Sequence, residues 1–88
     1  MSDIALEFRG AKFHPDGSTA HHLAIIWEPE MDMATRNWCC TVGCYSLVPD
    51  AEKIIGTSAG QALRLARLFA LDLMERHGVV IYPADREQ

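Results

Sequence analysis

The sequence predicts an α+β domain: an antiparallel β-meander, in the order β-β-β-β-α-β, with one long helix packed on one face of the sheet. In the first half of the chain apolar and polar residues alternate, as they do in half-buried strands. Short turns that contain proline, glycine or aspartate separate these alternating segments. The segment 58–78 instead repeats its apolar residues with helical spacing, so we expect a single helix to cover the sheet.

The first two strands are marked by alternation and by the turn between them. Residues 4–8 alternate, and the apolar positions change parity after Gly10, which indicates a β-bulge at that glycine. The His-Pro-Asp-Gly sequence at 14–17 is typical of a turn. A second strand is expected over 21–28 and ends at Pro29. Because both of its faces are apolar, we place this strand in the centre of the sheet.

The remaining strands are shorter or interrupted. The segment 30–36 has no clear period and is expected to be a loop. A third strand is expected over 38–47, and Gly43 in its middle indicates a bend or a bulge. A short fourth strand over 53–56 leads into the helix, and a last strand follows over 79–82.

The helix has recognisable signals at both ends. Ser58 is suited to cap the first turn, and Gln61 stands three residues further on, as a capping box requires. Gly78 follows the last periodic residues and can take the left-handed conformation that ends a helix. The predicted core-facing side is broad and apolar: Ala62, Leu65, Ala66, Phe69, Ala70, Leu73 and Met74, with Leu63 at its margin.

Leu68 and Leu71 do not belong to that apolar side, because they lie among the charged residues on the opposite side of the helix. Scattered surface leucines would explain them. A second buried contact would explain them as well, most simply a homodimer seam. The candidate interface residues are Leu68, Leu71, Arg64 and Glu75.

Length and composition fit one globular domain. The 88 residues are 49% hydrophobic, and we expect a single domain over 1–88 with a frayed tail at 83–88. The net charge, 8 − 12 = −4, disfavours nucleic acid as a partner. No apolar run approaches the roughly 20 residues of a membrane span, and the N-terminus lacks the features of a signal peptide. With Cys39, Cys40 and Cys44 expected as free thiols, the sequence predicts a cytoplasmic protein.

Residues suited to metal or thiol chemistry are present but poorly spaced. Cys40 and Cys44 would lie about 13 Å apart along a regular strand, too far for one zinc bound at about 2.3 Å from each sulfur. We therefore expect no metal and no cofactor. The residues that would supply such a site are His14, His21 and His22 around the first hairpin, with Cys40 paired to one of the latter two across neighbouring strands.

Two short motifs resemble a family of short bacterial proteins of unknown function. These are Trp38-x-Cys40 in the third strand and the Gly-Thr-Ser-Ala-Gly-Gln-Ala-Leu segment at 56–63. Members of that family combine an N-terminal meander with a G-x-D-S-x-Q-A-L helix start. Thr57 stands where the family usually has an acidic residue. The resemblance covers most of the chain and implies a fold, but no activity.

The same helix start is similar to the G-D-T-x-x-E-A-L segment of HicB-type antitoxins, whose β-β-β-α-β unit it opens. Gly78 before a final strand adds to this similarity, whereas the proline- and glycine-rich segment that precedes the helix in that family is missing. The resemblance implies an antitoxin-like protein that blocks a basic RNase-type partner with its acidic surface.

Three functions follow as hypotheses. The first is a non-catalytic protein–protein interaction module that acts as a homodimer, with a further protein partner possible. The alternative is a HicB-like binder of a basic partner. The second alternative is a small metal-binding or thiol-dependent enzyme.

Overall fold

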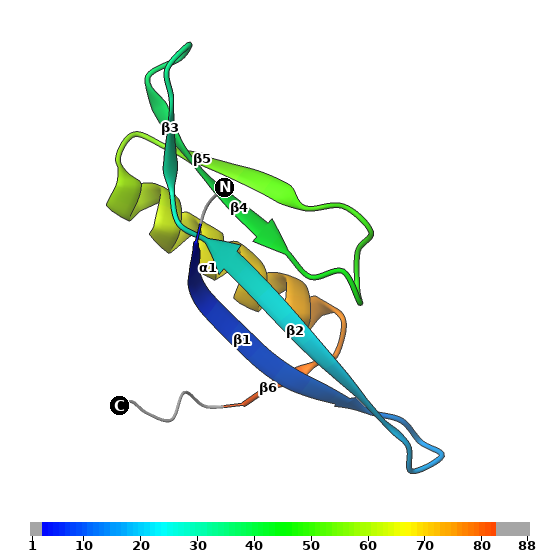
Figure 1. The fold of residues 1–88 in the computed structure, drawn as a ribbon. Helices are drawn as coiled ribbons and strands as arrows, with labels where there is room; N and C mark the ends of the chain where they lie inside the picture. The colour runs from blue at the N-terminus through cyan, green and yellow to red at the C-terminus, as the bar shows by residue number, and fades with distance from the viewer. Residues whose placement is uncertain (1–2, 83–88) are drawn as a thin grey trace.

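The computed structural model describes residues 3–82, which form a six-stranded antiparallel sheet with one helix packed against it (Figure 1). This architecture confirms the predicted α+β class. The predicted frayed tail, 83–88, lies outside the described residues. In chain order the elements are β1 (Ile4–Phe13), β2 (Thr19–Trp27), β3 (Glu30–Asp32), β4 (Asn37–Gly43), β5 (Glu52–Gly56), α1 (Ala59–Arg76) and β6 (Val80–Ile81).

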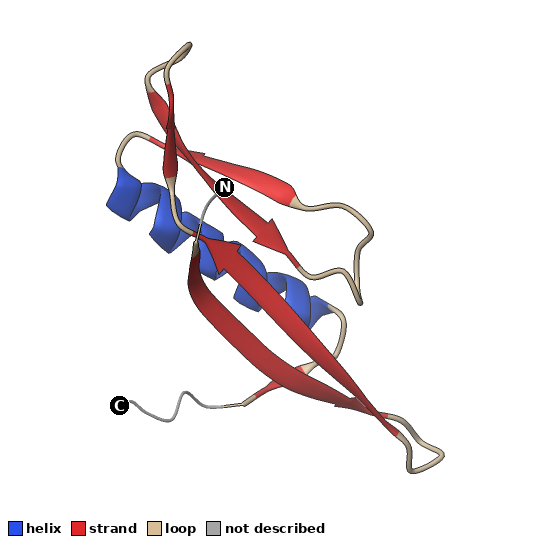
Figure 2. Ribbon diagram, viewed as in Figure 1, coloured by secondary structure: helices blue, strands red, loops and turns tan. Residues whose placement is uncertain are grey.

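The sheet is built around β2 and β4. β1 pairs with β2 in a long hairpin, and β6 adds to the other edge of β1. β5 lies on one side of β4, while β2 and β3 follow one another along its other side. The central place predicted for the second strand is therefore confirmed. The helix lies in its own layer on one face, and the opposite face of the sheet carries no second layer within residues 3–82 (Figure 2).

The segment predicted as a loop, 30–36, is instead a short hairpin arm and its turn. β3 pairs with the start of β4, and residues 33–36 form the turn. Asp32 Oδ1 accepts a hydrogen bond from the Ala34 N–H at 2.9 Å, and the Asp32 carbonyl accepts one from the Arg36 N–H at 2.7 Å. Arg36 takes a left-handed φ of 63° to close the turn. The prediction was wrong because a three-residue strand is too short to show alternation.

The bulge predicted at Gly10 was also wrong. β1 keeps one register with β2 from Leu6 onward, and the irregularity lies between Ile4 and Leu6. Gly10 is needed for a different reason. A Cβ at this position would lie 2.6 Å from both Val79 Cγ1 and the Val80 carbonyl oxygen, so only glycine lets β6 approach β1 this closely.

A bulge does occur where β2 passes into β3. Residues 27–29 lie opposite only residues 40–41 of β4, so the β2–β3 side has one extra residue. Pro29, which has no N–H to donate, fits this break in the ladder. Cys40, on β4 opposite the bulge, donates a hydrogen bond from its thiol to the Trp27 carbonyl at 3.1 Å.

The third predicted strand, 38–47, is shorter than expected. β4 ends at Gly43, and the chain then turns over 44–47. The N–H groups of Leu47 and Val48 both donate to the Cys44 carbonyl, at 2.9 and 3.0 Å. The apolar side chains after Gly43 continue the alternation in the sequence, but they belong to a turn packed beside the sheet.

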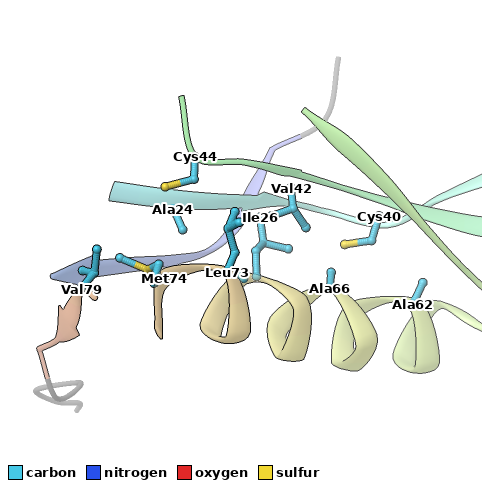
Figure 3. Close-up of a cluster of buried hydrophobic side chains, with 11 residues drawn as sticks. Ala24, Ile26, Cys40, Val42, Cys44, Ala62, Ala66, Leu73, Met74 and Val79 are labelled. Atoms are coloured by element: carbon cyan, nitrogen blue, oxygen red, sulfur yellow. The ribbon is translucent and has the colours of Figure 1, made fainter. Parts of the chain in front are cut away.

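The core lies between α1 and the sheet. Ala62, Ala66, Ala70 and Met74 repeat every four residues along α1, and none of them exposes any of its surface. The small alanines let the helix axis come close to the sheet, where they face buried side chains such as Ile26, Cys40 and Val42 (Figure 3).

The apolar side of α1 is narrower than predicted. Leu65, expected to face the core, is 38% exposed, whereas Phe69 and Leu63 are half-buried against the edge of the cluster. The reason is geometric, since a helix that approaches a sheet through a single row of alanines buries a narrow stripe and leaves its margins in solvent.

Candidate interaction surfaces

Both ends of α1 are held by local hydrogen bonds. At the N-terminus Ser58 is the cap residue, and its Oγ accepts a hydrogen bond from the Gln61 N–H at 3.1 Å. Gln61 Oε1 in turn accepts from the Thr57 N–H at 2.7 Å, which is one residue earlier than in the usual capping box. At the C-terminus Gly78 has a φ of 77°, and its N–H donates to the Glu75 carbonyl at 3.0 Å. These hydrogen bonds define where the helix begins and ends, and therefore which residues lie on its outer face.

The outer face of α1 points away from the sheet and carries the four predicted interface residues. Leu68 is 57% exposed, and Leu71 is half-buried. Arg64 and Glu75 are exposed one turn beyond the leucines, on either side. These four residues are called the outer-face set below.

A second apolar surface lies on the open face of the sheet, opposite α1. Leu23, Ile25 and Trp27 alternate along β2 with the core-facing residues and are half-buried on this side. Ile55 of β5, on the same face, is 60% exposed. From the sequence, this surface was predicted only as the second apolar face of a central strand. That the face is uncovered is known only from the folded structure.

Two aromatic rings gather on that open face around Gly43. A Cβ at Gly43 would lie 3.1 Å from the ring of Trp27 and 2.9 Å from the ring of Tyr45. Glycine thus lets both rings lie against the backbone of β4. Tyr45 remains 57% exposed. Sequence reasoning missed this pair, because Trp27 and Tyr45 belong to different elements that meet only in the folded sheet.

The histidines do not converge on a metal site. His14 and His21 are exposed, and His22, on the opposite side of β2 from His21, is half-buried. His22 Nδ1 lies 2.7 Å from Ser46 Oγ, a contact between segments far apart in sequence that no local pattern could predict. No group of three or more His, Cys, Asp or Glu side chains within residues 3–82 is arranged to hold a metal ion.

The hydrogen-bond partner of Cys40 is a main-chain carbonyl and not the histidine that the thiol-dependent alternative requires. Its thiol donates to the Trp27 carbonyl, and its side chain is fully buried. Burial raises the pKa of the Cys40 thiol, and the nearby negative charge of Glu28 raises it further. The thiolate needed for nucleophilic or metal chemistry is therefore disfavoured at this position.

A shallow depression of about 270 Å³ lies on the hairpin formed by β1 and β2. It is lined by Arg9, Gly10, His21, His22, Leu23 and Tyr82. The only hydrogen bond that His22 makes among the described side chains is to Ser46. Without a carboxylate to orient the imidazole, this Ser–His contact lacks the third group that a nucleophilic triad needs. The geometry thus offers two apolar surfaces and no assembled catalytic set within the described part of the chain.

Over residues 3–82 no helix combines the length and the apolar character needed to cross a membrane. Comparison of the chain with protein-family models, with curated proteins and with solved structures finds no match.

Proposed function

We propose that this protein is a non-catalytic protein–protein interaction module that acts as a homodimer through the outer face of α1. The observation that carries the proposal is Leu68, which exposes 57% of its surface at the middle of a well-capped helix, beside Leu71 and between charged residues. An exposed apolar patch with a polar rim is the usual character of a contact surface.

The small size of the core supports the same conclusion. The largest side chains that are fully buried are Ile26, Met74, Cys40 and Cys44, and the helix contributes mostly alanines. A domain of this size buries a modest share of its surface on its own, so a second copy would add apolar burial that the monomer lacks.

The cytoplasmic location predicted from the sequence belongs to this proposal, and the three free cysteines fit a reducing compartment. The HicB-like alternative also acts by protein contact, and the net charge of −4 supports a basic partner for it. The thiol-dependent alternative is weakened by the buried, hydrogen-bonded Cys40.

The experiment that tests the proposal is sedimentation velocity on the wild type and on Leu68→Asp. We expect a dimer for the wild type and a folded monomer for the variant, because the carboxylate would be buried in the seam without a partner. Ile55→Asp is the matched control, since Ile55 is 60% exposed, but on the open face of the sheet. That control should remain a dimer.

Circular dichroism and thermal melting of each variant separate loss of the dimer from loss of the fold. A wild type that sediments as a monomer at every concentration, or a Leu68→Asp variant that still dimerises, would remove the outer face of α1 from this role. Dissociation by Ile55→Asp alone would move the contact to the open face of the sheet.

A further inference from the structure

We infer that two copies of this chain pair through α1 as an antiparallel, twofold-symmetric helix pair. In this pair Leu68 packs against Leu71 of the second copy, and Arg64 forms an ion pair with Glu75 of the second copy. The inference rests on the proposed function and adds to it the direction, the register and the charged contacts of the interface.

The spacing of the outer-face set is that of a helix–helix seam. The four residues follow one another at intervals of four, three and four positions, the a and d pattern of a heptad. At about 100° per residue they fall within an arc of roughly 60°. They therefore form one narrow strip along α1, which is the shape of surface that a second helix can cover.

The strip has the same kind of residue at equal distances from its middle, and its ends carry opposite charge. The middle falls between Phe69 and Ala70, with the two leucines nearest to it and Arg64 and Glu75 further out. A twofold axis through this point reverses the partner helix. Each leucine then meets the other leucine, and each cation meets an anion, at both ends of the seam.

The same charges disfavour a parallel pair of helices. In a parallel pair, equivalent residues face one another, so Arg64 would meet Arg64 and Glu75 would meet Glu75. Contacts between like charges are unfavourable and select against that arrangement. The antiparallel register gives two leucine layers flanked by two ion-pair layers, over about 16 Å of helix.

Within the described residues, neither Arg64 nor Glu75 is engaged in an ion pair that would compete with these contacts. The ion pairs within residues 3–82 are Arg9 with Glu7 and Arg76 with Asp72, and neither involves an outer-face residue. The outer face also points away from the sheet, so two copies would stack as sheet, helix, helix, sheet (Figure 2). Both open sheet faces, with Trp27 and Tyr45, would remain on the outside.

Charge reversal tests the register. Arg64→Glu places two acidic side chains together at each end of the seam, and Glu75→Arg places two basic ones together. We expect each single variant to weaken the dimer by about tenfold or more, since each creates two like-charge contacts. The double variant exchanges the two charges, restores both ion pairs, and should return the dissociation constant to within about twofold of the wild type.

Controls with the same change in net charge are available in β5, where Lys53 and Glu52 are both exposed. Lys53→Glu matches Arg64→Glu, and Glu52→Arg matches Glu75→Arg, so long-range effects of net charge appear in both members of each pair. Each control variant should change the dissociation constant of the dimer less than the charge-reversal variant in α1 that it matches.

The outcomes distinguish this inference from the proposal on which it rests. Weakening by both single variants and recovery in the double variant would support the antiparallel register. Single variants without effect, or a double variant as weak as the singles, would overturn the register while a monomeric Leu68→Asp still supports a helix-mediated dimer. A wild type that is a monomer would overturn both.

Discussion

At the residue scale, the Cys40 side chain both donates a hydrogen bond at the bulge and packs in the core. At the bulge between β2 and β3 the ladder with β4 is interrupted, and there the Cys40 thiol donates to the Trp27 carbonyl. The same side chain is small and apolar enough to fill the core beneath α1. A residue that the sequence offered as a candidate for chemistry is thus explained by packing and hydrogen bonding.

The raised pKa of Cys40 gives a pH-dependent prediction. Because the folded-state pKa lies above the value of the unfolded chain, the folded protein keeps its proton longer, and stability falls as pH rises above about 9. The free energy of unfolding from urea denaturation should therefore decrease more steeply between pH 8.5 and 10 for the wild type than for Cys40→Ala. Equal slopes for the two proteins would show that Cys40 does not contribute to alkaline destabilisation.

Gly10 provides a second prediction at the same scale. Gly10→Ala would bring a methyl group 2.6 Å from the Val80 carbonyl, a backbone atom that cannot turn aside. We expect a loss of about 1 to 3 kcal/mol in the free energy of unfolding as β6 is displaced. Gly60→Ala is the control, since a Cβ there meets nothing within 4 Å. That change should leave stability unchanged or raise it by up to about 1 kcal/mol, because alanine favours the helix.

At the scale of the element, α1 combines two surfaces with different demands. Its inner stripe needs small residues, because Ala62, Ala66 and Ala70 set how closely the helix approaches the sheet. Its outer face lies outside the buried cluster, and the contact with a second copy that we propose would give the leucines there a role. The capping bonds at Ser58 and Gly78 fix where the helix begins and ends, and hence which residues share each face.

The inner stripe can be tested by overpacking. Ala66→Leu adds three carbon atoms at a position that exposes none of its surface, and the helix would have to move away from β4. We expect destabilisation by about 1 to 3 kcal/mol or more. Leu68→Ala, on the exposed outer face of the same helix, should change stability by no more than about 0.5 kcal/mol when both proteins are measured at a concentration at which they are monomeric. Similar losses for the two variants in chemical denaturation would contradict the assignment of the faces.

At the scale of the whole molecule, one helix covers one face of the sheet, and two apolar surfaces are left uncovered by residues 3–82. In the pair that we infer, the outer face of α1 is complementary in charge to its own reversed copy. The oligomeric state, measured with the Leu68 and charge-reversal variants, is therefore the first property of the whole molecule to establish.

The sequence by itself determined the α+β class, the limits of α1 and the central place of the second strand. These features follow from periodicity and from capping residues, which act within a few positions of the chain. The candidate interface was also identified from the sequence, since helical spacing places Leu68 and Leu71 outside the apolar stripe, among charged residues. Whether a second copy covers them is a property that no intramolecular pattern records.

Tertiary structure alone decided the remaining features. The role of Gly10 and the partner of the Cys40 thiol depend on strands that are separated in the sequence. β3 pairs locally with β4, but its three residues are too few to show alternation. The helical spacing placed Leu65 on the core-facing side of α1. In the structure it is 38% exposed, because the helix approaches the sheet closely through a narrow row of alanines. Local sequence sets which conformations are favourable, whereas the distance between packed elements sets which side chains are buried.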